Sequence, residues 1–245
     1  MKKAVSRVYL TLIYIFLYAP ILLLVVFSFN DTDTKSRTVW SGFSLRWYEM
    51  LFQDRMLLEA LKNTLIIAVC AALGATVLGT VAAIGINSMK GWRKKLVMNV
   101  TNLPMLNPEI VTGVSLMLLM VFVANLFGIS LGMGSIILAH ITFCLPYVIL
   151  SVLPKLGQMD PHLYEAAQDL GCTPLRSFFK VVMPEIMSGV ITGMVMAFTL
   201  SLDDFIISYF CSGTTQTLPV YIYSMTTTRV SPESNALFRH RIDIH

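Results

Sequence analysis

Long stretches of this chain contain no Asp, Glu, Lys or Arg, and their lengths predict helices that cross a membrane. The uncharged or nearly uncharged stretches are Val8–Phe29, Asn63–Met89, Ile110–Pro154 and a region from about Met187 to Cys211. The third is 45 residues long, enough for two spans of about 20 residues, and a glycine-rich turn at 128–134 would join them. The last is interrupted only by Asp203 and Asp204. The pattern therefore predicts five transmembrane helices.

Composition supports this interpretation. The 245 residues are 56% hydrophobic and 13% charged, and the mean hydropathy is +0.71. The charged share is about half that of a typical soluble domain, so too few polar side chains remain to cover a soluble globule. We expect an all-α integral membrane protein, a polytopic helical bundle forming a single transmembrane domain over residues 1–245. An ordinary cytoplasmic enzyme, a secreted disulfide scaffold and a disordered chain are excluded.

The distribution of charge predicts how the spans are oriented. The net charge is +4, which in a membrane protein points to cytoplasmic loops and lipid rather than to nucleic acid. Residues 90–95 carry four cations and no acid, and Lys2, Lys3 and Arg7 precede the first span. By the positive-inside rule the N-terminus, residues 90–95 and the loop 154–185 lie in the cytoplasm. The four cysteines have no CxxC or Cys/His spacing, so we expect no disulfide frame and no metal site.

One face of the second span consists of small residues at spacings that let helix backbones approach closely. They are Ala68, Ala71, Ala72, Gly74, Ala75, Gly79, Ala82 and Ala83. This face predicts packing against another helix, either of this chain or of a partner chain.

The long loop 154–185 contains two predicted helices. Pro161 opens a stretch that Gly171 stops, and Pro174 opens a second that Pro184 ends. The two short helices would form a compact amphipathic projection at the membrane surface. It either lies on lipid or docks a soluble cytoplasmic partner.

This loop resembles the EAA loop of permease subunits of ABC importers that use a periplasmic binding protein. The resemblance rests on Glu165-Ala166-Ala167, on Gly171 six residues after Glu165, and on Pro184 thirteen residues after Gly171. It implies that Glu165, Ala166, Ala167 and Gly171 couple the chain to an ATPase. Small residues at these positions suit close helix packing. The chain has no GxxxxGK[ST] phosphate loop, so ATP and its magnesium would be used by the partner, and we expect neither a catalytic site nor a bound cofactor here.

Two adjacent carboxylates, Asp203 and Asp204, follow Ser201 in the fifth span. A carboxylate at this depth costs about 2.5–3.5 kcal/mol on insertion scales, so these residues are candidates for a substrate path. Adjacent residues on a helix point about 100° apart, and both need not face the same cavity. Three interpretations stay open: carboxylates at the water boundary or paired to neighbours, a site that attracts a cation, and a proton relay of a secondary transporter.

Four further segments resemble permease subunits of spermidine/putrescine importers, the second of the two permease chain types more closely. They are Phe29-Asn30-Asp31, residues 42–48, residues 140–146 and residues 198–204, and Val230-Ser231-Pro232-Glu233 agrees with them. The resemblance implies a type I importer fold in the bacterial inner membrane, with a second permease subunit, a dimer of ATP-binding subunits and a periplasmic binding protein as partners. The alternatives are an importer of another small organic solute and a secondary transporter that does not use ATP.

Three smaller features remain. Glu109 is expected to start a helix after Asn107-Pro108, or to lie near an inner gate. His140 is expected to be a hydrogen-bonded interior histidine rather than a ligand. Such permeases have a sixth span, whereas residues 238–245 form a divergent polar tail, so the chain is truncated, frameshifted or divergent.

Overall fold

The computed structural model describes residues 2–31, 40–128, 130–160 and 162–228. Its regular structure within these ranges is helical, apart from one isolated bridge between Asn30 and Phe43. Five helical segments are long and apolar enough to cross a membrane, which confirms the predicted number. The polar tail 238–245 and the motif 230–233 lie outside the described residues.

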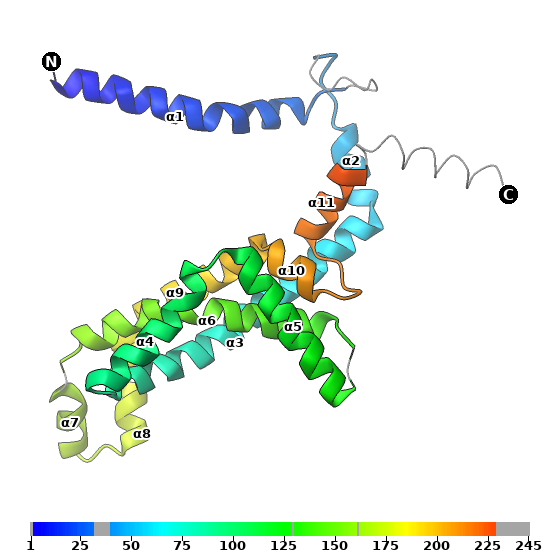
Figure 1. The fold of residues 1–245 in the computed structure, drawn as a ribbon. Helices are drawn as coiled ribbons and strands as arrows, with labels where there is room; N and C mark the ends of the chain where they lie inside the picture. Colours follow the sequence, from blue (N-terminus) through cyan, green and yellow to red (C-terminus); the bar gives the residue numbers. More distant parts are fainter. Residues whose placement is uncertain (1, 32–39, 129, 161, 229–245) are drawn as a thin grey trace. The chain divides into compact units, whose positions relative to one another are not determined.

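In chain order, the helices are α1 (Lys2–Phe27), α2 (Arg46–Gln53), α3 (Arg55–Ser88), α4 (Gly91–Leu106), α5 (Glu109–Phe127), α6 (Met133–Gln158), α7 (His162–Asp169), α8 (Pro174–Ser177), the π-helical turn η1 (Phe178–Val182), α9 (Met183–Asp203), α10 (Ile206–Cys211) and α11 (Leu218–Thr228) (Figure 1). The chain divides into two compact units, Met1–Leu58 and Glu59–His245.

The first unit holds α1, α2 and a small aromatic cluster between them. The ring of Phe29 stacks on the rings of Phe43 and Tyr48, with both pairs of centroids 5.3 Å apart. The indole N–H of Trp47 donates to the carbonyl oxygen of Asn30 at 3.0 Å. The segments 29–31 and 42–48, two of those that resemble importer permeases, therefore fold against each other.

The core of the second unit is the contact between α6 and α9, which run side by side (Figure 1). Every fourth residue of α9 on the contact face is small and buried: Gly189, Gly193, Ala197 and Ser201. Because these residues carry little or no side chain, the backbones come close. A Cβ added at Gly189 would lie 2.7 Å from the carbonyl oxygen of Ser151, and one at Gly193 would lie 3.1 Å from the Cα of Val148. Membrane helices associate largely by such close packing, since lipid is as apolar as the side chains.

The small face of α3 packs against the same helix, α6. A Cβ added at Gly74 would lie 2.6 Å from the side chain of Ile141, and one at Gly79 would lie 2.7 Å from that of Val148. Ala68, Ala75 and the other alanines buried on this face have an exposed fraction of 4% or less. The sequence left open whether the small-residue face packs against this chain or a partner chain. The structure shows that its neighbour is a helix of this chain.

Several predicted boundaries were wrong. The second span begins at Arg55 rather than Asn63, and α6 continues through Pro154 to Gln158 because Val152 and Leu156 bury their side chains in the core. Proline removes one backbone hydrogen bond, which neighbouring helices can offset in a membrane bundle.

The region 174–211 also differs from expectation. Pro184 does not end the helix opened by Pro174, because the chain continues without a gap through the π-helical turn η1 into α9, whose second residue is Pro184. Local π-helical geometry is one way in which a membrane helix accommodates the N–H that proline lacks. The fifth span is not continuous to Cys211, because α9 ends at Asp203 and α10 starts at Ile206. An unpredicted helix, α4, covers Gly91–Leu106 and contacts α6.

The close contact at Gly189 gives a test of this core. We expect Gly189→Ala to lower the free energy of unfolding by about 1–3 kcal/mol, because the added methyl meets backbone atoms of α6 that cannot move aside. Gly157→Ala is the matched control, since a Cβ there meets nothing within 4 Å and alanine is the better helix former. Thermal unfolding of the purified protein in detergent would compare the two. Equal midpoints would mean that the α6–α9 contact is looser than described.

Candidate functional site

The break between α9 and α10 is the most polar buried region of the second unit. Asp204 ends α9 with an extended backbone (φ −68°, ψ 119°), and Phe205 precedes the first residue of α10. The Asp204 carboxylate accepts a hydrogen bond from the backbone N–H of Ser208 at 2.8 Å. It therefore binds one of the N–H groups that the first turn of a helix leaves without a partner.

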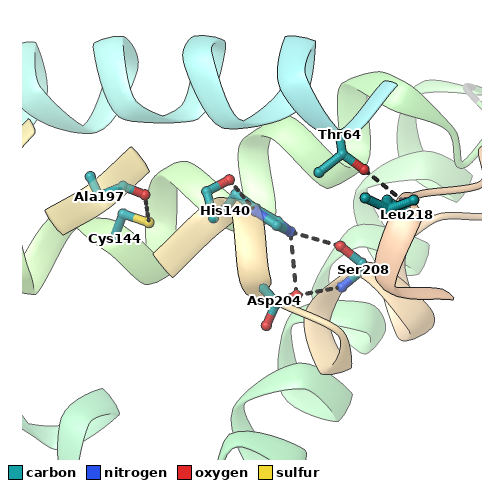
Figure 2. A network of polar contacts seen from close by, with 8 residues as sticks. Thr64, His140, Cys144, Ala197, Asp204, Ser208 and Leu218 are labelled. Atoms are coloured by element: carbon teal, nitrogen blue, oxygen red, sulfur yellow. Dashed lines mark hydrogen bonds and ion pairs between the residues drawn. The ribbon is translucent and has the colours of Figure 1, made fainter. Parts of the chain in front are cut away.

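His140 of α6 reaches into this break and contacts three side chains (Figure 2). Its Nδ1 shares a hydrogen bond with Ser201 Oγ at 2.6 Å, and its Nε2 shares one with Ser208 Oγ at 3.2 Å. The same Nε2 lies 3.5 Å from an Asp204 carboxylate oxygen. His140 is fully buried, which confirms that it is an interior, hydrogen-bonded histidine.

This network explains how a carboxylate can be buried here. An ion without partners inside a protein is costly, and the cost falls when hydrogen bonds replace those lost from water. Only 6% of the Asp204 side chain is exposed, and it has both the Ser208 N–H and the His140 ring beside it. Ser201 is buried as well, on the α9 face toward α6. Asp204 and Ser201 thus join α6, α9 and α10.

Asp203 is in a different environment. It is exposed, and no hydrogen bond or ion pair is recorded for it among the residues that the structure describes. The two adjacent carboxylates therefore have different surroundings: Asp204 is enclosed in a network and Asp203 is exposed. No group of three His, Cys, Asp or Glu side chains within the described ranges is arranged as a metal ion would need.

A third carboxylate lies near this break. Glu109 starts α5, as predicted, although Pro108 rather than Asn107 is at the N-cap position. One turn later, Gly113 packs against Ile206 of α10, with an added Cβ only 3.0 Å from its side chain. The Glu109 carboxylate interacts electrostatically with Asp204. The sequence pattern did not predict this proximity, because it did not predict α4, and without α4 Glu109 would lie beside the basic residues 90–95.

The segment that resembles the EAA loop consists of α7, α8 and η1, residues 162–182, and lies at one end of the second unit (Figure 1). We call it the coupling segment, after the role that the resemblance implies. Glu165 and Ala166 are exposed on α7, and Ala167 is half-buried. Leu170, Leu175 and Phe179 are large apolar side chains with exposed fractions of 87%, 73% and 62%. The segment thus presents an acidic residue and an uncovered apolar surface together.

Gly171 is needed for its backbone conformation, whereas the expectation that its small size allows close helix packing stays a prediction. Its φ is +86°, and a Cβ there would meet nothing within 4 Å. Its N–H donates to the carbonyl of Gln168 at 2.8 Å, and the Cys172 N–H donates to that of Ala167 at 3.1 Å. These two bonds are those of a Schellman motif, which ends a helix with a left-handed residue, usually glycine.

The different surroundings of the two adjacent carboxylates can be tested by stability. Asp204→Ala should lower the free energy of unfolding by about 1–3 kcal/mol, because it leaves the buried Ser208 N–H without its acceptor. Asp203→Ala is the control and should change it by less than about 0.5 kcal/mol, as for most surface substitutions. Unfolding midpoints of the two purified variants would be compared with the parent. A larger loss for Asp203→Ala would contradict the assignment.

Comparison with known proteins places this arrangement in a family. Residues 75–232 match the family described as binding-protein-dependent transport system inner membrane component. The chain is 43% identical over 235 residues to the putrescine transport system permease protein PotI of Escherichia coli K12, covering 94% of this chain and 83% of that protein. It is 39% identical over 230 residues to the spermidine/putrescine transport system permease protein PotC of Haemophilus influenzae, covering 94% and 87%.

A solved structure shares the fold. A crystallised bacterial ABC transporter involved in the import of the acidic polysaccharide alginate contains a chain with a TM-score of 0.73 to this one. The match covers 97% of this chain and 85% of that chain at 14% identity, so it bears on the fold alone. The family match and the identity to the two permeases, in contrast, bear on the role. The chain is a multi-pass inner-membrane permease component that works with a binding protein and a separate ATPase subunit, and it belongs to the family of binding-protein-dependent transport system inner membrane components.

Proposed function

We propose that this chain is a permease subunit of an ATP-driven importer of polyamines such as spermidine and putrescine. The observation that carries the proposal is the 43% identity, over 94% of the chain, to a permease named for putrescine transport. Polyamines are chains of methylene groups that carry several positive charges. A path for them needs hydrogen-bond acceptors and negatively charged side chains, and it must lack positively charged side chains.

The acids near the α9–α10 break supply that chemistry. Asp203 is exposed and free to attract an ammonium group, and the Glu109 carboxylate lies near enough to Asp204 for the two to interact electrostatically. Like charges close together in low dielectric repel each other, and a bound cation relieves that repulsion. We propose that Asp203 meets the cargo while Asp204 and Ser201, held by His140, fix the position of the break.

The coupling segment supplies the contact with the ATPase in this proposal. Glu165, Ala166, Ala167 and Gly171 would seat α7 in a cleft of one ATP-binding subunit of a dimer. The exposed apolar side chains Leu170 and Leu175 would be buried there. In this proposal, α7 and the N-terminus lie on the cytoplasmic side, and the α9–α10 break lies in the outer half of the membrane. A second permease subunit would complete the path.

The coupling segment and the α9–α10 break are connected directly along the chain. From α7, the chain continues through α8 and the π-helical turn η1 directly into α9, and α9 ends at Asp203. Closure of the ATPase subunits on ATP would displace α7, and α9 would carry that displacement toward the outer end of the path. The binding protein would then release its cargo into a path that opens outward.

The cargo can be tested with the complex that co-purifies with this chain, reconstituted in lipid with its binding protein. Spermidine and putrescine should stimulate ATP hydrolysis, and sulfate should not, because an acidic path repels an anion. Asp203→Asn should lower the stimulation by about tenfold, the effect of losing roughly 1.4 kcal/mol of attraction. If polyamines stimulate the variant as strongly as the parent, the importer proposal stands and the proposed contact between Asp203 and the cargo is wrong. Stimulation by sulfate alone would refute a polyamine cargo.

The coupling role can be tested with Glu165→Ala. We expect substrate-stimulated ATP hydrolysis and uptake to fall by about tenfold, because a small number of interface residues contribute most of the binding free energy between two proteins. The unfolding midpoint should not change, because 74% of the Glu165 side chain is exposed. Glu59→Ala, another exposed acid, lies in α3 on the opposite side of the membrane and is the matched control. Equal effects of the two substitutions would argue against docking at α7.

A further inference from the structure

The helix α9 has three distinct faces, which follow from placing its residues at about 100° per residue. One face is the buried contact with α6. A second is exposed and apolar, with Met187, Ile191 and Val195, and suits lipid. Between them lies a narrow exposed sector, about 60° wide. It holds Glu185, Ser188, Thr192, Thr199 and Asp203, all of them exposed.

This sector, which we call the polar face of α9, collects every charged and hydroxyl residue of the helix except Ser201, which is bonded to His140. It runs about 27 Å along the helix axis at 1.5 Å per residue, close to the ~30 Å thickness of the hydrocarbon layer. Its one apolar interruption is at Met196, between Thr192 and Thr199. A helix surrounded by lipid gains nothing from gathering its polar groups in one row.

The chemistry of the polar face is that of an acceptor. The Thr192 hydroxyl donates to the carbonyl oxygen of Ser188 at 2.8 Å, and the Thr199 hydroxyl donates to that of Val195 at 2.9 Å. Because each proton is already used, these oxygens present only lone pairs outward. The two charged residues of α9, Glu185 and Asp203, are both acids and carry acceptors alone when ionised.

An ammonium group is the complement of such a surface, since it has N–H donors, a positive charge and no acceptor. We propose that the polar face of α9 lines the path of the polycationic cargo. The hydroxyl oxygens of Thr192 and Thr199 would accept hydrogen bonds from its ammonium groups, further inward than Asp203. This inference rests on the proposed import of polyamines and extends it from one carboxylate to the whole length of a helix. The other possible neighbours of this face are a helix of the second permease subunit, packed without water, and lipid.

Charge of opposite sign at one position distinguishes these neighbours. In the reconstituted complex, Thr199→Lys should lower the maximal rate of polyamine uptake at least about tenfold, while Thr199→Glu should change it less than about threefold, because only the cation repels the cargo. Thr142 of α6 is the matched control, since it is also exposed and donates to the carbonyl four residues earlier, at 2.8 Å. Its Lys and Glu variants should not differ from each other.

Each result decides between the neighbours. Equal loss with both Thr199 variants in an assembled complex would mean a dry helix contact, and no loss with either would mean that the cargo does not pass there. Both results overturn the inference.

If neither charged variant assembles, Thr192→Val/Thr199→Val is compared with the parent, because it removes only the two acceptors. A loss of uptake of at least about threefold with normal assembly supports the inference, and parental uptake overturns it. A parent that imports no polyamine would instead refute the proposed function.

Discussion

The close contact between α6 and α9 is the constraint on which the rest of the second unit depends. In a membrane, burying apolar surface gives little driving force, so helices must come near enough for dispersion contacts along their backbones. Gly189, Gly193 and Ala197 make that possible, and Ser201 continues the same row. At its C-terminal end the row brings Ser201 within 2.6 Å of His140. The polar network is thus an extension of a packing contact.

That extension explains why two neighbouring carboxylates can have different surroundings. The helix ends where the row of small residues ends, and the change of direction at Asp204 turns this side chain inward to His140 and Ser208. Asp203, still on the last turn of α9, stays on the opposite side of the axis from Ser201. A continuous helix through this region would have left both carboxylates without the capping N–H of α10.

The sequence predicted what depends on composition and local order. A membrane admits only segments whose backbone groups are all paired internally, so uncharged stretches predicted the five spans. The Gly171 stop was predicted as well, because a helix ending in a left-handed residue is a local property. Boundaries at Pro154 and Pro184 were wrong, since neighbouring packing decides whether a helix continues past a proline. The helix α4 was missed because its basic start, Arg93–Lys95, has the charge pattern of a cytoplasmic loop.

What the sequence could not predict are contacts between distant residues. His140 is 61 residues from Ser201 and 68 from Ser208, and no periodicity connects them. These contacts also limit how the permease can move. Since α9 is joined to α6 by backbone contact and by the His140 network, we expect the two helices to move as one body. Under the proposed function, a displacement of α7 that passes through η1 would shift Asp203 relative to a second permease subunit, while its position relative to His140 stays fixed. If Asp203 meets the cargo as proposed, its surroundings would then change without a change in its own geometry.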